Sequence, residues 1–149
     1  MSSYTEDAIA RLKERGYRIT TPRRNVLELL DRLQKPVSPY EIKELLEQAR
    51  VRIDTVSIYR ILDCLEQNGL IHRVLSIGKY RKCDLDIEDH CRLKQAEHCH
   101  HNLVCRACGA IEELHCPDLS KLERAVSEHT GFRIEGHELE FRGLCGKCA

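Results

Sequence analysis

Hydrophobic residues recur at helical spacing four times in the first half of the chain, between residues that start and stop helices. Ser3 and Glu6 make a capping box ahead of the first segment, and Gly16 marks its end. Ser38 and Glu41 repeat the capping box ahead of the third segment. The pattern therefore predicts a short amphipathic helix after each box.

The second and fourth segments carry other start and stop signals. Thr21 is expected to cap the second helix, with Pro22 at its first position. The fourth helix is expected to follow Asp54 and to stop at Asn68 and Gly69. Its apolar positions share one face, and they are Ile58, Ile61, Leu62 and Leu65.

Two short β-rich runs follow the fourth helix, and the turn Ile77-Gly78-Lys79 between them predicts a hairpin. Helices followed by a hairpin predict a winged-helix domain over residues 1–84, in which the fourth helix is the recognition helix. The first turns of such a helix lie in the major groove of DNA. The side chains expected to meet DNA are Thr55, Ser57, Tyr59 and Arg60. A plain helical bundle, or a winged domain that binds another protein, is the alternative.

From Asn102 the hydrophobic pattern changes to strand spacing. Strands are expected in NLVC and GAIEEL, followed by a helix between Pro117 and Gly131 and a long strand in FRIEGHELEFRGLC. Such an open sheet has uncovered edges, which favours dimerisation through the sheet. We therefore predict an α+β chain: the winged-helix domain, a linker over residues 85–100, and a small α/β dimerisation domain over residues 101–149.

The net charge of the 149-residue chain is zero, but the charge is unevenly distributed. Residues 1–82 hold 16 Lys and Arg against 11 Asp and Glu, and residues 83–149 hold 8 against 13. The basic half suits a polyanion, whereas the acidic half is rich in Cys and His. The sequence shows neither the pattern of a signal peptide nor an apolar run of membrane-spanning length, so we expect a cytoplasmic protein with reduced thiols and no membrane partner.

Two CxxC pairs carry the strongest chemical signal, and they are Cys105 with Cys108 and Cys145 with Cys148. Each pair comes at the end of a predicted strand, where two thiolates turn toward one point. Four thiolates form the closed tetrahedral set that structural zinc prefers, and such a site staples a small domain. Thiol redox chemistry is the alternative, but CGKC lacks the following helix that lowers the thiol pKa in redox motifs.

Four stretches resemble the successive blocks of the ferric uptake regulator family, whose members are bacterial, dimeric, metal-dependent transcription factors. They are GYRITTPRRNVLELL, TVSIYRILDCLEQNGLIHR, HHNLVCRACGAIEEL and GFRIEGHELEFRGLCGKC. The family's Pro-Arg pair in helix two falls on Pro22 and Arg23. The resemblance implies that Tyr59 and Arg60 contact DNA and that the four cysteines hold a structural zinc, and we expect Arg23 to contact phosphate.

The branches of this family differ in their regulatory metal site. The iron branch has Glu where this chain has Cys83, a His near Pro36, and a His at the position of Asn102, so the resemblance argues against iron. The ligands of the zinc-uptake branch fall on His72, Cys83, His98 and Glu113. A thiolate, two imidazoles and a carboxylate suit zinc by softness and geometry.

Two features of the second half depart from the pattern of the zinc-uptake branch. The segment before the first CxxC pair is longer than usual and offers several His residues. The spacing to Cys105 favours His98 as the ligand, and His100 is the alternative. The family's accessory metal site is matched in part, by His101 and His137, with Ser120 where an acidic ligand is expected.

The resulting hypothesis is a zinc-responsive repressor that binds a palindromic operator as a homodimer, controls zinc-uptake genes and holds two Zn²⁺ per subunit. The nearer alternative is an iron- or peroxide-responsive member of the same family. The distant alternative is a zinc-ribbon thiol oxidoreductase. The HExxH and HxE…PCxxC patterns do not occur in the sequence, so neither an enzyme nor a small-molecule substrate is expected.

Overall fold

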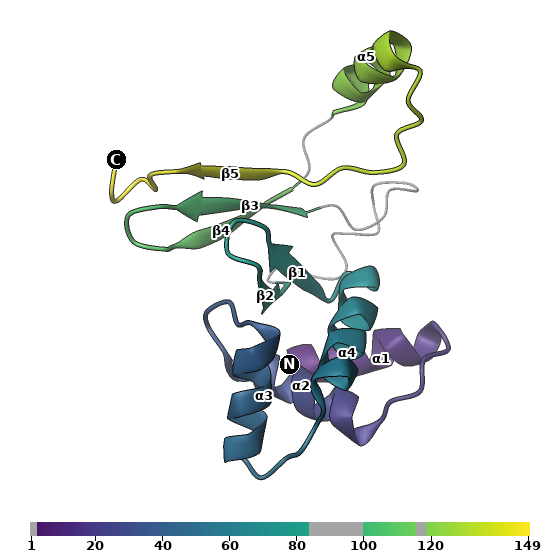
Figure 1. Cartoon of the computed structure of the whole chain (residues 1–149), viewed down its shortest axis with the longest axis vertical. Helices are drawn as coiled ribbons and strands as arrows, with labels where there is room; N and C mark the ends of the chain where they lie inside the picture. The colour runs from purple at the N-terminus through teal and green to yellow at the C-terminus, as the bar shows by residue number, and fades with distance from the viewer. Residues whose placement is uncertain (1–2, 84–99, 116–118) are drawn as a thin grey trace. The chain divides into compact units, whose positions relative to one another are not determined.

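The computed structural model describes residues 3–83, 100–115 and 119–149. The chain divides into two compact units, Met1–Asp86 and Ile87–Ala149. The first contains four helices and a two-stranded sheet, and the second contains a three-stranded sheet and one helix (Figure 1). The predicted α+β class is confirmed.

Both predicted capping boxes are present at the helices of the first unit, which are α1 (Tyr4–Glu14), α2 (Thr21–Arg32), α3 (Pro39–Gln48) and α4 (Thr55–Gln67). Ser3 Oγ accepts a hydrogen bond from the Glu6 amide at 3.3 Å, and the Glu6 carboxylate accepts one from the Ser3 amide at 3.2 Å. Ser38 and Glu41 repeat this arrangement before α3. The helix starts are therefore set by local hydrogen bonds.

The predicted cap of α2 is wrong by one residue. Thr20 is the cap, and its hydroxyl oxygen accepts from the Arg23 amide at 3.4 Å, whereas Thr21 is the first helical residue. Two neighbouring threonines offer the same hydroxyl group, so residue type does not distinguish them. The hydroxyl that reaches the third amide of the helix is the one that caps it.

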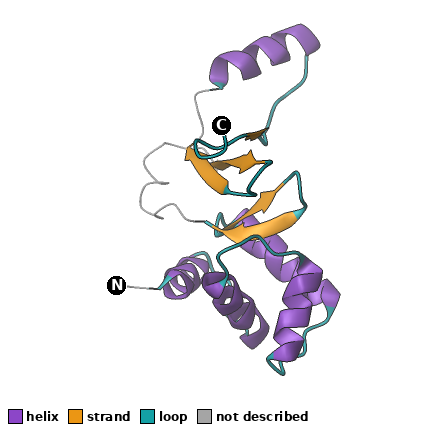
Figure 2. Cartoon of the chain, turned by 90° about the vertical axis from the view of Figure 1, so that its left-hand side faces the viewer, coloured by secondary structure: helices purple, strands orange, loops and turns teal. Residues whose placement is uncertain are grey.

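The four helices pack their apolar faces around one core, which Figure 2 shows as the purple bundle beneath the hairpin. Its fully buried side chains include Leu12, Leu27, Leu30, Ile42, Ile58, Leu62, Leu65 and Leu70. Burial of each such side chain contributes roughly 1.5–3 kcal/mol to stability. The predicted apolar face of α4 is confirmed, since all four of its positions are buried.

The wing is an antiparallel pair of strands, β1 (Ile71–Val74) and β2 (Lys79–Lys82). Gly78 in its turn has a φ of +63°, which glycine adopts without strain. The wing is also tied to the segment before α3, because Val37 and Tyr80 exchange two backbone hydrogen bonds of 2.8 Å each. Lys79 Nζ reaches the Glu41 carboxylate at 2.8 Å. These contacts join the N-terminus of α3 to the hairpin.

The sheet of the second unit has the order β4-β3-β5. Its strands are β3 (His100–Cys105), β4 (Ile111–His115) and β5 (Glu140–Gly143), with β5 parallel to β3. The predicted long last strand is wrong in extent, because only four of its residues pair with β3. Alternation of apolar and polar residues favours an extended chain, but a strand also needs a partner edge.

The last helix, α5 (Ser120–Thr130), ends where predicted, with Gly131 in the left-handed region at a φ of +71°. Within this chain none of its side chains is buried, and Leu122 and Val126 are 61% and 41% exposed. Among the described residues, its apolar face is therefore largely uncovered by the rest of its own unit. No helix among the described residues is long and apolar enough to cross a membrane.

The link between α3 and the wing predicts a pH-dependent stability. Hydrogen bonds from the Lys79 ammonium and the Ser38 amide lower the pKa of Glu41 from 4.5 to about 2. A lowered pKa stabilises the fold above the unfolded value, and this contribution is lost as the pH falls through the folded value. We expect Glu41→Gln to lower the free energy of unfolding at pH 7 by on the order of 1 kcal/mol, since solvent screens the pair.

The difference from wild type should shrink between pH 4.5 and about pH 2, as measured by urea unfolding at a series of pH values. Glu44→Gln, on an exposed position of the same helix, is the control. A Glu41→Gln difference that stays constant over this range would show that ionisation of Glu41 is not its cause.

Candidate functional site

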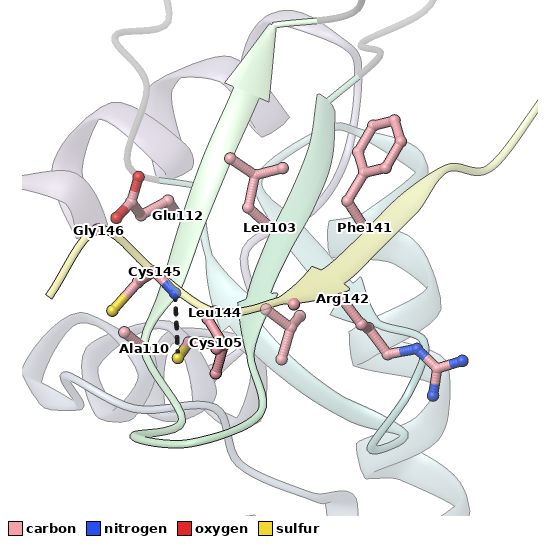
Figure 3. Close-up of a pocket in the computed structure, with 11 residues that line it drawn as sticks. Leu103, Cys105, Ala110, Glu112, Phe141, Arg142, Leu144, Cys145 and Gly146 are labelled. Atoms are coloured by element: carbon pink, nitrogen blue, oxygen red, sulfur yellow. Dashed lines mark hydrogen bonds between the residues drawn. The ribbon is translucent and has the colours of Figure 1, made fainter. Parts of the chain in front are cut away.

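The parallel pairing of β3 with β5 brings the two CxxC pairs together. Cys105 ends β3 and lies beside Gly143, the last residue of β5, so that Cys145 follows at the same edge of the sheet. Figure 3 shows Cys105 and Cys145 side by side, joined by a hydrogen bond of 3.3 Å from the Cys145 amide to the Cys105 sulfur. The ligand atoms of all four cysteines, Cys105, Cys108, Cys145 and Cys148, lie within 4.8 Å of one another.

The four thiols differ in their ease of ionisation. The backbone N–H groups of Cys108 and Cys145 point at the Cys105 sulfur and lower the pKa of Cys105 to about 6. Hydrogen bonds with the sulfurs of Cys145 and Cys108 raise the pKa of Cys148 to about 12. One thiolate therefore forms readily and opposes the ionisation of its neighbours. A divalent cation supplies the positive charge that lets all four ionise, and four thiolates at this spacing fit tetrahedral zinc.

A hollow of about 310 Å³ lies on the sheet next to this cluster (Figure 3). Leu103 and Phe141 are paired across β3 and β5 and line it, and Leu144 lies at its edge. Phe141 and Leu144 are 50% and 44% exposed. This unit thus presents two apolar surfaces, the hollow and the outer face of α5.

A second group of ligand atoms lies on the wing. His72 is in β1, and Cys83 follows β2 on the diagonal position of the same sheet face. The Cys83 amide donates to the Leu70 carbonyl at 3.0 Å, and its thiol is buried. A ring nitrogen of His72 and the Cys83 sulfur lie within 4.8 Å of one another. An imidazole and a thiolate at this spacing can bind one transition-metal ion.

The other predicted ligands belong to the second unit. Glu113 is in β4, opposite Asn102 of β3. His98 lies outside the described residues, and His100 begins β3. The first unit therefore brings the ligand atoms of His72 and Cys83 together, and the full set of regulatory ligands stays a prediction.

A histidine pair occupies the position of the expected accessory site. His137 Nδ1 lies 2.6 Å from Glu123 Oε1, and His137 Nε2 lies 3.2 Å from His101 Nε2. Ser120, where an acidic residue was expected, begins α5, and Glu123 lies one helical turn further on. Burial and the neighbouring His137 lower the pKa of His101. Glu123 was not predicted as the acidic partner of His137. The only signal for it in the sequence is its i, i+3 spacing from Ser120 on the same helix.

The recognition helix exposes the face opposite its core positions. Tyr59 is 39% exposed, Arg60 is exposed, and Thr55 begins the helix. The Ser57 hydroxyl donates to Asp54 Oδ2 at 2.5 Å, so Ser57 forms part of the helix cap. This bond accounts for the orientation of the hydroxyl, and the contact of Ser57 with DNA stays a prediction.

Two other exposed apolar or aromatic side chains of the first unit were not singled out from the sequence. Val56 is 59% exposed on α4, and Tyr40 is 68% exposed in the first turn of α3. The helical spacing of Val56 to Tyr59 and Arg60 was the available signal. Tyr40 lies between Ser38 and Glu41 of the capping box, and this motif predicts the start of a helix but not the exposure of the residue inside it.

Arg23, the expected phosphate contact, is held in place by its neighbours. Its guanidinium carbon lies 5.8 Å from the centre of the Tyr17 ring, and its Nη1 donates to the Arg18 carbonyl. These contacts place the guanidinium beside Tyr17 and Arg18 at the start of α2, and its contact with phosphate stays a prediction.

A winged-helix unit joined to a small sheet unit with a four-cysteine cluster defines a metal-binding transcription regulator. The model of the ferric uptake regulator family matches residues 14–142, and the chain belongs to this family. Its members are metal-responsive regulators of transcription and not enzymes.

Known relatives include regulators of different metals. The ferric uptake regulation protein of Neisseria gonorrhoeae is 32% identical over 142 residues, covering 94% of this chain and 92% of its own. The zinc uptake regulation protein of Escherichia coli is 28% identical over 135 residues, covering 91% and 75%. A zinc uptake regulator in complex with zinc and DNA is 25% identical, with a TM-score of 0.80 and coverage of 99% and 95%.

The four-cysteine cluster leads to a prediction about metal content. Cys148→Ser should lower the bound zinc by about one ion per chain, because three thiolates no longer complete the closed site. It should also break the dimer, since the strand ends that the metal joins would separate. Atomic emission after desalting and sedimentation velocity measure the two effects.

Cys64→Ala is the control, because Cys64 is buried in the core of the first unit, where burial raises the pKa of its thiol. It should keep the full metal content. A dimeric Cys148→Ser protein with unchanged zinc would refute the assignment of the cluster.

Proposed function

We propose that this protein is a zinc-responsive transcription repressor that binds a palindromic operator as a homodimer and controls zinc-uptake genes. The observation that supports zinc is the pair of His72 and Cys83 on the wing, whose ligand atoms lie within 4.8 Å. A thiolate is a soft ligand that favours zinc, whereas a carboxylate at this position would admit harder metals. The relatives include both iron and zinc regulators, so this ligand pair carries the argument.

The regulatory site that we propose consists of His72 and Cys83 from the first unit and Glu113 from the second, with His98 or His100 as the fourth ligand. Together with the ion on the four cysteines, this makes two zinc ions per chain. The closed site has a structural role, while the mixed site binds and releases zinc. Zinc bound by residues of both units holds the units in one arrangement.

Zinc then acts by population shift, because it binds the joined arrangement more tightly than the open one. Fixing the units also fixes the spacing of the two recognition helices in a dimer, which must match two half-sites. If zinc raises operator affinity a hundredfold, operator DNA raises zinc affinity by the same factor, which is a coupling of about 2.7 kcal/mol. Loss of zinc would release the operator.

Dimerisation is proposed to use the exposed apolar surfaces of the second unit. The face of α5 with Leu122 and Val126, and the sheet hollow with Phe141, are uncovered within one chain. Large exposed apolar side chains that cluster in a small domain are typical of a protein interface. A second copy of the chain offers the same surfaces for mutual burial.

DNA binding is proposed to use the exposed face of α4, with Tyr59 and Arg60 at base edges and Val56 beside them. Tyr40 on α3 and Arg23 on α2 would reach the backbone or a neighbouring base.

The second candidate is an iron- or peroxide-responsive regulator of the same family. The observation on its side is the 32% identity to the Neisseria iron regulator, and the metal-binding experiments below distinguish the two candidates.

Cys83→Ser tests the zinc assignment. With zinc retained in the four-cysteine site, cobalt in the wild-type regulatory site should give a thiolate-to-cobalt charge-transfer band in the near ultraviolet. Cys83→Ser should abolish this band and zinc-dependent operator binding. It should leave the structural zinc, the fold and the dimer unchanged, because Cys83 is not one of the four clustered cysteines.

An operator for these measurements can be selected from random duplexes with the zinc-loaded wild-type protein. A variant that keeps both the band and the zinc dependence would place the sensor elsewhere. Tight binding of Fe²⁺ with iron-dependent operator binding, and no response to zinc, would support the iron-responsive alternative.

Tyr59→Ala and Arg23→Ala should separate base readout from phosphate contact. Tyr59→Ala should lower the discrimination between operator and random duplex by about 1 to 3 kcal/mol. Arg23→Ala should weaken both duplexes and reduce the slope of log affinity against log salt by about one. Fluorescence anisotropy at several salt concentrations measures both. Equal weakening of operator and random DNA by Tyr59→Ala would argue against base readout at that position.

A further inference from the structure

The carbonyl oxygen of Leu70, at the start of the wing, accepts two hydrogen bonds. The Cys83 amide donates to it at 3.0 Å, and the Tyr4 hydroxyl donates to it at 2.6 Å. Leu70 is 1% exposed, so this oxygen has little access to water. Tyr4 is the first residue of α1, 66 positions before Leu70. The N-terminal helix is therefore bonded to the same atom that aligns the backbone of Cys83.

The residue before Cys83 is attached to the same region. Lys82 Nζ donates to Asp31 Oδ1 at 2.9 Å and to the Asp31 carbonyl at 3.0 Å, and it lies 5.5 Å from the centre of the Tyr4 ring. Asp31 Oδ2 accepts from the Thr5 hydroxyl at 3.0 Å. Burial alone would raise the pKa of Asp31, but the bonds from Lys82 and Thr5 outweigh it and lower the pKa. The ion pair is therefore formed at neutral pH.

Cys83 needs such support because it lies just beyond the last residue of β2. The wing has only four residues in each strand, and an isolated hairpin of this size is marginally stable in water. A metal ligand must hold its sulfur in one position before the metal arrives, since any freedom lost on binding weakens affinity. The Leu70 carbonyl supplies that constraint on the Cys83 backbone, and Tyr4 holds the carbonyl.

We propose that Tyr4 is a positioning residue for the Cys83 thiolate, so that α1 helps to set the affinity of the wing for its metal. The inference rests on the proposed function, in which Cys83 binds the regulatory metal. Tyr4 has no role as a ligand: it acts through the Leu70 carbonyl. By reciprocity, metal bound at Cys83 stabilises the attachment of α1 to the wing.

Tyr4→Phe tests this, because it removes the hydroxyl and keeps the ring. With zinc retained in the four-cysteine site, cobalt titration of the full-length variant should show about tenfold weaker binding at the thiolate site than wild type, the usual effect of losing a supporting bond behind a ligand. The charge-transfer band should remain at saturation, because the ligands are unchanged. Ser3→Ala is the matched control, since it loosens the same helix by removing its cap and does not touch Leu70.

Hydrogen exchange gives a second measurement, which compares each protein with and without zinc in its regulatory site. Filling the regulatory site of the wild-type protein with zinc should slow amide exchange in α1, and Cys83→Ser should abolish the effect. Tyr4→Phe should reduce the slowing in α1 while the amides of α3 respond as in wild type.

Three results would overturn the inference: unchanged cobalt affinity in Tyr4→Phe, equal weakening by Ser3→Ala, or exchange in α1 that does not respond to zinc. Each would leave the proposed function standing if the Cys83-dependent band is present. Absence of that band in the wild-type protein would overturn the proposed function, and this inference with it.

Discussion

The parallel pairing of β3 with β5 is the constraint on which the second unit depends. It joins the segment ending at Cys105 to the segment leading to Cys145 through only four register pairs. Cys108 and Cys145 are 37 positions apart in the chain, and closing a loop of that length costs about 3 kcal/mol in chain entropy. A structural zinc on four thiolates supplies about 10 kcal/mol or more in small domains. The free energy of metal binding at the strand ends is therefore larger than the entropy cost of closing this loop.

The wing of the first unit is stabilised by contacts with the helices around it. Its two strands are too short to be stable in isolation, and contacts from outside the hairpin support both ends. At one end Val37 pairs with Tyr80, and Lys79 reaches Glu41 at the start of α3. At the other end α1 and the C-terminal part of α2 hold the segment before Cys83. The helical core thus determines where the ligands of the wing lie.

Local chemistry accounts for what could be predicted with residue precision. Helix caps and glycine stops act over three or four residues, so both ends of α1 and α4 and the start of α3 follow from the sequence. The four-cysteine cluster also followed, because two CxxC pairs at strand ends have one simple way to combine. Two predictions were wrong in detail, the cap of α2 and the length of the last strand. Thr20 and Thr21 offer the same cap, and the last strand pairs with β3 over only four residues.

The sequence by itself determined the fold class, three of the four helix caps of the first unit, the core face of the recognition helix and the pairing of the cysteines, since each depends on residue type and short spacing. Only the tertiary structure decided which side chains are already engaged. It placed Glu123 within 2.6 Å of His137, 14 positions away, where an acid was expected at Ser120. It also placed the Tyr4 hydroxyl on the carbonyl that aligns Cys83. The Tyr4–Leu70 bond joins residues 66 positions apart, and no periodicity or motif records it, because it forms only when α1 packs against the start of the wing.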